Sequence, residues 1–164
     1  NKDKLMGMVQ SQKESDTVYK VGCLGKISDY QKSKDGRVLI NLTGITRFKI
    51  LDEKINDKLY REFNVNYKCF ENDIIKMTEK INPFRLMEKA KIFFKKSGLL
   101  LNWREFEKLD QNQQINTLAM ISPVTNEEKQ KILEAVTLDQ KVTTLENIID
   151  FYLHEVNFFN QTIQ

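Results

Sequence analysis

The sequence is poor in the residues on which most catalytic and metal sites depend. It has a single histidine, His154, and two cysteines, Cys23 and Cys69, which lie far apart and outside any C-x-x-C pair. This spacing excludes a disulfide framework and a zinc knuckle, and it leaves few ligands for any metal ion. Each cysteine lies in a strand-like pattern, where we expect the free thiol to behave as a small buried hydrophobe.

Long apolar runs and an excess of one charge are also missing. No apolar run approaches the ~20 residues of a transmembrane helix, and no charged-then-apolar leader opens the chain. We therefore expect a soluble, cytoplasmic protein with no membrane partner. Basic residues number 26 and acidic residues 23, a near balance, and only five of the basic residues are arginine, which phosphate recognition favours over lysine. This composition disfavours a nucleic-acid partner.

Three common catalytic designs lack their sequence motif. The six glycines include no G-x-x-x-x-G-K-[ST] phosphate loop, and no G-x-S-x-G elbow accompanies His154. Ser97 follows Lys95 and Lys96, but this group lies at the end of a predicted exposed helix, whereas an activated lysine needs burial. We therefore expect a protein that is not an enzyme and that has no cofactor and no metal. An unrecognised hydrolase ranks last among the alternatives.

The first half of the chain has the patterns of antiparallel strands. Asp35-Gly36 supplies the positive-φ positions of a tight turn, and the residues after it alternate between apolar and polar, which predicts a β-hairpin. Further strands are predicted over residues 5–9, 18–27 and 60–67. Gly22 and Gly25 lie inside one of these strands, which indicates a bulge or a close approach of backbones, and curvature of a barrel is the preferred explanation.

The second half changes to a helical period near Pro83. A helix is predicted over residues 84–97, ending before Gly98, and apolar spacing predicts two more between residues 103 and 121. The patterns T-N-E-E at residues 125–128 and T-L-D-Q at residues 137–140 are capping boxes, which mark two further helix starts. The sequence thus predicts an α+β protein with a β-rich part, residues 1–81, and an α-helical bundle, residues 82–164.

Several motifs of the chain resemble a known family. They are G-C-L-G-K-I at residues 22–27, D-G-R at 35–37, L-I-N-L-T-G at 39–44, R-F-K-I at 47–50 and L-A-M-I-S-P at 118–123. In this order they are similar to the N-terminal domain of Lon protease, especially to stand-alone bacterial proteins that consist of little else. The resemblance implies a small PUA-like β-barrel followed by a helical bundle. In that family Arg47 would be a strand residue that anchors a neighbouring loop.

The resemblance also implies that the barrel is N-terminally incomplete in this chain. Family members open with a further strand-rich segment before a strand similar to Gly7-Met8-Val9. A barrel without those strands would expose an unpaired edge. We therefore expect that a strand segment precedes Asn1 in the complete protein.

The function implied by the resemblance is binding of polypeptides without cutting them. The expected partners are unfolded or damaged polypeptides and a Lon-type protease, with a role as adaptor or weak chaperone. RNA binding by a PUA-like barrel is the alternative. Exposed apolar surface and the cleft between barrel and bundle are the expected site, and five aromatic residues are its candidates: Tyr60, Phe63, Tyr67, Phe70 and Trp103. The competing interpretation is that these aromatics fill the core.

Overall fold

The computed structural model describes residues 3–13, 15–75 and 81–161, with side chains as far as residue 154. The chain divides into two compact units, Asn1–Thr78 (unit 1) and Glu79–Gln164 (unit 2). An antiparallel sheet comes first and the long helices follow it, so the expected mixture of strands and helices is confirmed. In the described part of the chain, no helix combines the length and the apolar character needed to cross a membrane.

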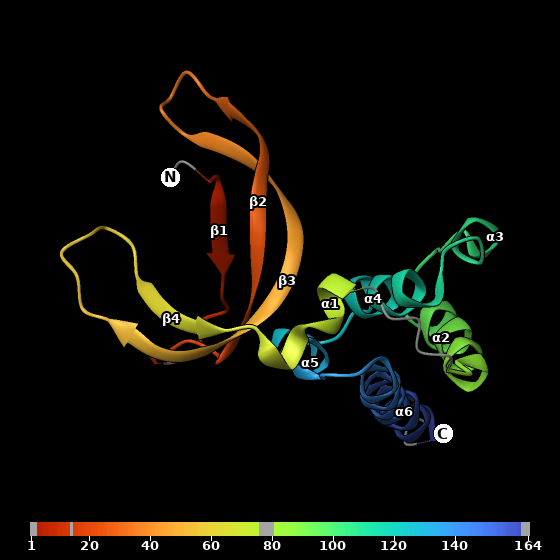
Figure 1. Ribbon diagram of the computed structural model, residues 1–164. Helices are drawn as coiled ribbons and strands as arrows, with labels where there is room; N and C mark the ends of the chain where they lie inside the picture. Colours follow the sequence, from red (N-terminus) through yellow and green to blue (C-terminus); the bar gives the residue numbers. More distant parts are fainter. Residues whose placement is uncertain (1–2, 14, 76–80, 162–164) are drawn as a thin grey trace. The chain divides into compact units, whose positions relative to one another are not determined.

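Unit 1 is a four-stranded antiparallel sheet in which each strand pairs with the next one along the chain. A 3-10 helix and a short α-helix follow the last strand (Figure 1). The elements are β1 (Leu5–Met8), β2 (Val21–Lys32), β3 (Val38–Lys54), β4 (Glu62–Asn66), η1 (Lys68–Phe70) and α1 (Asn72–Ile75). Among the described residues no pairing joins β1 to β4, so the closed barrel stays a prediction.

The predicted hairpin joins β2 to β3. Its turn is closed by a hydrogen bond from Ser33 N to Arg37 O of 2.8 Å, and Gly36 has the positive φ of 86° that favours glycine. β3 is long enough to pair with β2 along most of its length and with β4 at its C-terminal end. The two hairpins that share β3 consequently project in different directions from its bend (Figure 1).

The small core of unit 1 is built around Phe48. Gly22 lies opposite Phe48 in the register, and a Cβ atom there would be only 2.6 Å from Phe48 Cζ. The same Cβ atom would be 2.6 Å from Met8 O, so the predicted close approach of backbones is confirmed at Gly22. The register of β2 with β3 shifts between Leu24 and Gly25, and the curvature of a barrel stays a prediction. The buried hydrophobic residues of the described part of unit 1 are Val21, Phe48, Ile50 and Phe70.

A buried ion pair fastens the short helices of unit 1 to the sheet. The carboxylate of Asp73 in α1 accepts hydrogen bonds from Arg47 N at 3.0 Å and from Arg47 Nε and Nη2, both at 2.8 Å. The Arg47 guanidinium also lies over the ring of Phe70, with Cζ 4.3 Å from the ring centroid. Arg47 is thus a strand residue that anchors the short helix α1, whereas the resemblance implied that it anchors a loop.

The two cysteines differ in their surroundings. Cys23 is half-buried in β2, and burial raises the pKa of its thiol. Cys69 is exposed in η1, so the prediction of a buried strand residue is wrong there. The chain leaves the sheet after Asn66 and coils, which directs Phe70 into the core and leaves Cys69 at the surface.

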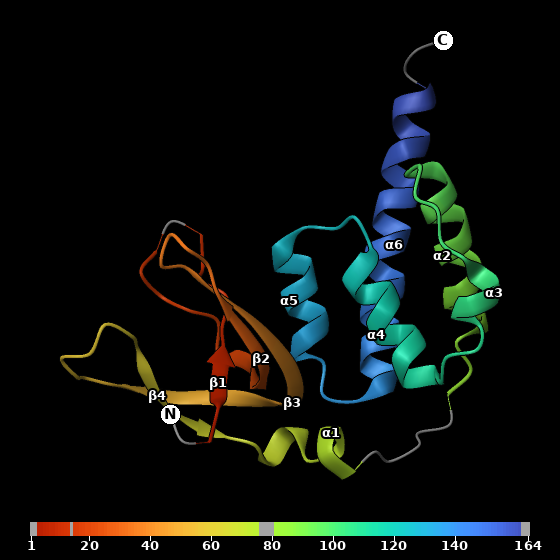
Figure 2. The ribbon, with the colours of Figure 1, turned by 90° about the horizontal axis from the view of Figure 1, so that it is seen from above.

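Unit 2 is a bundle in which the longest helix runs alongside α2 (Figure 2). Its helices are α2 (Phe84–Lys96), α3 (Trp103–Phe106), α4 (Gln111–Ile121), α5 (Asn126–Glu134) and α6 (Leu138–Gln161). Both predicted capping boxes are confirmed: Thr125 exchanges hydrogen bonds with Glu128, and Thr137 with Gln140. One core cluster of fourteen buried hydrophobic residues holds these helices together.

Candidate functional site

The structure places four of the five candidate aromatics in unit 1. Tyr60 lies in the loop between β3 and β4, Phe63 is half-buried in β4, and Tyr67 follows β4 with its ring edge-on to Phe48 at 6.4 Å between centroids. Phe70 is buried beneath Arg47 and therefore belongs to the core of unit 1. Tyr60, Phe63 and Tyr67 thus lie together along one hairpin.

Trp103 is the one candidate that belongs to unit 2. It is half-buried in α3, with ring centroids 5.9 Å from Phe94 and 5.5 Å from Phe106. The contacts of Trp103 are those of a packing residue at the edge of the bundle.

Unit 2 has a pocket of about 370 Å³ near the start of α2. Phe84 and Met87 line it, together with the ion pair of Lys91 and Glu107.

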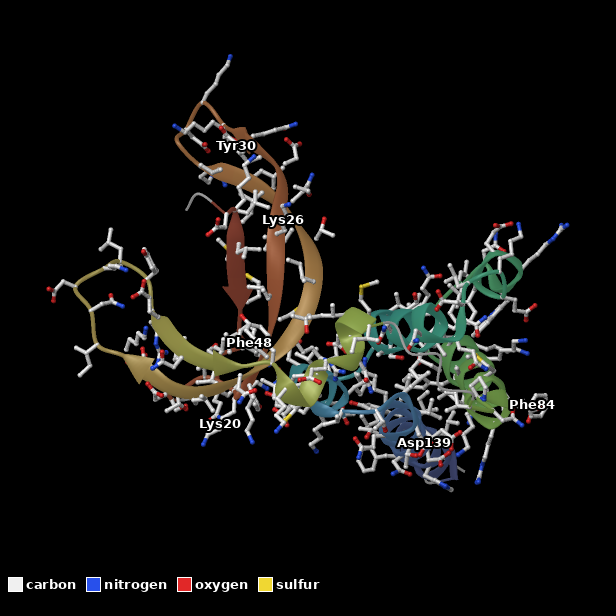
Figure 3. The ribbon with its side chains drawn as sticks, viewed as in Figure 1. Lys20, Lys26, Tyr30, Phe48, Phe84 and Asp139 are labelled. Carbon is white, nitrogen blue, oxygen red and sulfur yellow. The ribbon has the colours of Figure 1, made fainter. Side chains whose placement is uncertain are left out.

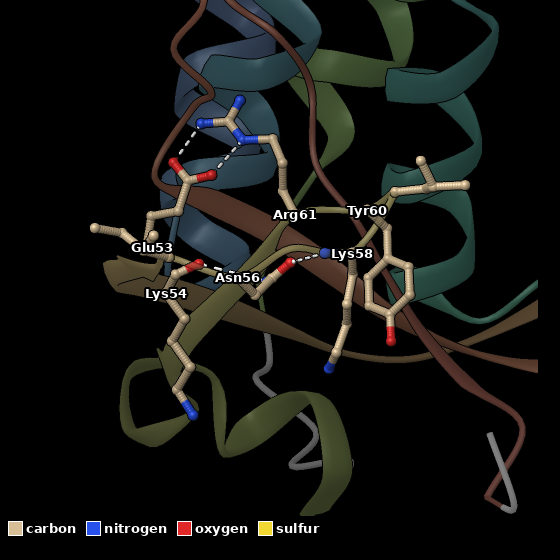
Figure 4. A pocket seen from close by; sticks show the side chains of 8 residues that line it. Glu53, Lys54, Asn56, Lys58, Tyr60 and Arg61 are labelled. Carbon is tan, nitrogen blue, oxygen red and sulfur yellow. Dashed lines mark hydrogen bonds and ion pairs between the residues drawn. The ribbon is translucent and has the colours of Figure 1, made fainter.

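The end of the β3–β4 hairpin, residues 53–62, contains a surface pocket of about 450 Å³ (Figure 4). We call this segment the β3–β4 tip. The pocket is lined by Glu53, Lys54, Ile55, Asn56, Lys58, Leu59, Tyr60 and Arg61. All eight residues come from the loop and the adjoining strand ends, so one continuous segment of the chain builds the whole pocket.

Three apolar side chains of the β3–β4 tip are directed into solvent. Ile55 and Leu59 are fully exposed, at 101% and 106%, and Tyr60 is 61% exposed. The sequence interpretation selected Tyr60 and missed the other two, because it considered aromatics only. The available signal was a pair of isolated aliphatic residues in an otherwise charged segment between two strands.

Ion pairs and hydrogen bonds hold the backbone of the β3–β4 tip in place. Arg61 donates from Nε and Nη2 to the two carboxylate oxygens of Glu53, both at 2.5 Å, and from Nη1 to Asp16 O at 3.0 Å. Asn56 Oδ1 accepts a hydrogen bond of 2.8 Å from Lys58 N, and Lys58 Nζ pairs with Glu62. The apolar side chains are therefore presented on an ordered loop, which reduces the entropy lost on binding a partner.

The charges of the β3–β4 tip largely neutralise one another. Residues 53–62 contain three acidic and three basic side chains. The hydrogen bond from Arg61 holds the pKa of Glu53 below that of an ordinary glutamate, and the hydrogen bond to Glu62 raises the pKa of Lys58. Both shifts favour the charged forms that make the ion pairs, and the equal numbers of acidic and basic side chains leave little net charge to attract a polyanion.

The search for metal ligands concerns the described residues alone. Within residues 3–13, 15–75 and 81–154, no three side chains of His, Cys, Asp or Glu gather as a metal site would require. His154 is exposed on α6. The arrangement at the β3–β4 tip can make contacts with another molecule, and its three protruding side chains give those contacts their apolar area.

The comparisons with known proteins agree with the fold. Residues 1–150 match the model of the ATP-dependent protease La (LON) substrate-binding domain. The chain belongs to this family. Among solved structures it is similar to a Lon N-terminal domain protein from Xanthomonas campestris, with a TM-score of 0.58 and 12% identity, over 87% of this chain and 88% of that chain. It is also similar to the N-terminal domain of the Mycobacterium avium complex Lon protease, with a TM-score of 0.54 and 16% identity, over 88% of this chain and 77% of that one.

At 16% and 12% identity, the similarity to the two solved structures is a similarity of fold alone. No curated protein matches the chain. The family match extends from the sheet of unit 1 into α6 of unit 2, so it covers unit 1 and most of unit 2.

Proposed function

We propose that this member of the Lon substrate-binding family is a non-catalytic module that binds unfolded or damaged polypeptides. The observation that carries the proposal is the β3–β4 tip, where Ile55, Leu59 and Tyr60 are exposed on a loop fixed by ion pairs. The contact of these apolar side chains with water is unfavourable. A polypeptide bound over them would remove their apolar surface from water and so gain free energy of binding.

The proposed binding surface continues from the β3–β4 tip onto β4. Phe63 and Val65 lie on the same face of this edge strand, since side chains alternate along a strand, and Tyr67 follows the strand directly. The guanidinium of Arg61 lies over the ring of Phe63, with Cζ 5.2 Å from the ring centroid, and so joins the tip to this face. We further propose that the four-stranded sheet forms part of a PUA-like barrel.

Two roles follow for a module of this kind, and they differ in what happens to the bound polypeptide. As an adaptor it would deliver the polypeptide to a Lon-type protease, and as a weak chaperone it would hold the polypeptide in solution. Cross-linking to a Lon-type protease and faster degradation of a bound substrate would support the adaptor. Slower aggregation of a heated test protein without the protease would support the chaperone.

Calorimetric titration of the full chain tests the proposed function. The probe is reduced, carboxymethylated lactalbumin, which stays unfolded, and the control is the same protein in its native form. We expect heat of binding with the unfolded form only. Binding of neither form, or equal binding of both, would contradict the proposal. Steeply salt-dependent binding of an RNA oligonucleotide in the same assay would instead support a nucleic-acid function.

A further inference from the structure

The outer half of the β2–β3 hairpin has one apolar face and one polar face. We call this half the arm; it comprises residues 27–32 and 38–42 and the turn between them. Opposed pairs in the register are Ile27 with Leu42, Tyr30 with Ile40 and Lys32 with Val38, and opposed residues lie on the same face. The other face carries the pairs Asp29 with Asn41 and Gln31 with Leu39.

The apolar face of the arm is open to solvent toward its free end, where Figure 3 shows Tyr30. Tyr30 is 60% exposed and Val38 49%, whereas Ile27, Ile40 and Leu42 are half-buried. β1 pairs with β2 as far as Lys26, and Ile27 N donates a hydrogen bond of 2.7 Å to Lys4 O, so among the described residues the arm beyond Ile27 is two-stranded. A two-stranded ribbon has little stability of its own, and a partner packed on its apolar face would add to it.

The dimensions of the apolar face fit one α-helix. Two strands lie about 5 Å apart, so the ribbon with its side chains is close to the ~10 Å diameter of a helix. Five residues of strand at about 3.3 Å each span roughly 16 Å, the length of about three helical turns. A single amphipathic helix laid along the ribbon would therefore cover the apolar side chains from Leu42 to Val38.

The charge at the end of the arm indicates which helix would fit. Residues 32–37 contain Lys32, Lys34 and Arg37 but only one acid, Asp35, and Arg37 pairs with this acid at 2.6 Å. Lys32 and Lys34 then have no carboxylate partner among the described residues. The turn itself is polar, so the arm is unsuited to entering a bilayer end-first, since such entry needs apolar residues at the end.

We propose that the arm is a docking surface for an amphipathic helix of a partner protein, with acidic residues beside its apolar stripe. The apolar stripe would cover Tyr30, Val38 and Ile40, and the carboxylates would pair with Lys32 and Lys34. This surface is distinct from the β3–β4 tip and does not depend on the proposed function.

The test measures fluorescence anisotropy of labelled synthetic helices titrated with the full chain. The probes are a helix with a leucine stripe and glutamates elsewhere, its counterpart with lysines, and a scrambled leucine-glutamate peptide. We expect the leucine-glutamate helix to bind most tightly. Tyr30→Ser with Val38→Thr should weaken it by about tenfold or more, because both exposed side chains are lost.

Two matched variants separate the apolar and the electrostatic contributions. Leu39→Ser removes an exposed leucine from the opposite face of the arm and should change affinity by less than about twofold. Lys32→Glu with Lys34→Glu should lower the affinity for the leucine-glutamate helix and raise the affinity for the leucine-lysine helix. Ile55→Ser with Leu59→Ser, at the β3–β4 tip, should leave helix binding unchanged.

Four results would overturn the proposal. The first is a leucine-glutamate helix that binds no more tightly than the scrambled peptide, and the second is a loss in Leu39→Ser as large as in the Tyr30 and Val38 variant. The third is binding of the chain to phosphatidylglycerol vesicles that is lost in the variant Tyr30→Ser with Val38→Thr, which would show that the arm binds lipid. The fourth is a dimer in sedimentation that the same variant dissociates, which would assign the arm to a second copy of the chain.

Discussion

The two units use their apolar residues in opposite ways. Among the side chains that the structure describes, fourteen buried hydrophobic residues form one cluster in unit 2, whereas unit 1 has four buried hydrophobic residues. The exposed large hydrophobic residues of the same described side chains show the reverse distribution, fourteen in unit 1 and seven in unit 2. Helices that bury their stripes against each other make a stable body, while a sheet with little covering presents apolar side chains to other molecules.

Leu145→Ala should cause the largest loss of stability, because Leu145 is fully buried in the core cluster of unit 2. We expect a decrease of about 2–5 kcal/mol in the free energy of unfolding. The sole tryptophan, Trp103, lies in unit 2 and reports its urea unfolding by fluorescence. Leu100→Ala, at a fully exposed leucine of the same unit, is the control and should stay within about 0.5 kcal/mol of the unaltered chain.

Asp73→Ala should destabilise unit 1 by about 2–3 kcal/mol, because it leaves the buried Arg47 guanidinium without its carboxylate. Asp73 is partly exposed, so the loss is below that of a fully buried pair. Hydrogen exchange of peptides from β2 and β3 measures the effect. Unchanged exchange would show that the ion pair does not hold η1 and α1 on the sheet.

Gly22→Ala should lower the free energy of unfolding of unit 1 by about 1–3 kcal/mol, since the new Cβ atom would meet the ring of Phe48. Gly44→Ala is the matched control, because the nearest atom to its Cβ would be Cys23 Sγ at an ordinary 3.8 Å. Exchange rates in β2 should rise in the first variant and not in the second. Equal rates in both would mean that the core around Phe48 adapts easily.

The smallest expected effect is electrostatic and concerns Glu53. The hydrogen bond from Arg61 lowers the pKa of this carboxyl in the folded state, so its stabilisation is present above the ordinary glutamate range and is lost as the pH falls through the lowered value. Carboxyl NMR titration of Arg61→Gln should show the pKa of Glu53 moving upward. An unchanged pKa would show that the ion pair does not form in solution.

Local patterns in the sequence were sufficient to predict the β2–β3 hairpin and the starts of α5 and α6. A turn or a cap is decided by residues within four positions, and Asp35-Gly36 and Thr125-x-x-Glu128 contain that information. The capping box of α4, between Asp110 and Gln113, was missed, although it has the same form with aspartate in place of threonine.

Contacts between distant residues could not be predicted in the same way. The ion pair of Arg47 with Asp73 joins positions 26 residues apart, and nothing near Asp73 indicates that it would meet β3. At the candidate site the aromatics were a partial guide: Tyr60 is exposed and Phe70 is buried, because burial depends on the fold and not on residue type. Ile55 and Leu59 stand in the sequence as isolated aliphatic residues of a charged segment, but their full exposure is a property of the fold.

The binding of unfolded polypeptide by Ile55→Ser with Leu59→Ser, compared with Leu100→Ser, tests most directly whether the exposed apolar residues of unit 1 serve recognition. Leu100 is as exposed as the other two but lies in unit 2, so it controls for lost apolar surface in general. We expect affinity for carboxymethylated lactalbumin to fall about tenfold in the first variant and to stay within about twofold in the second. Equal affinities in both variants would contradict a binding site at the β3–β4 tip.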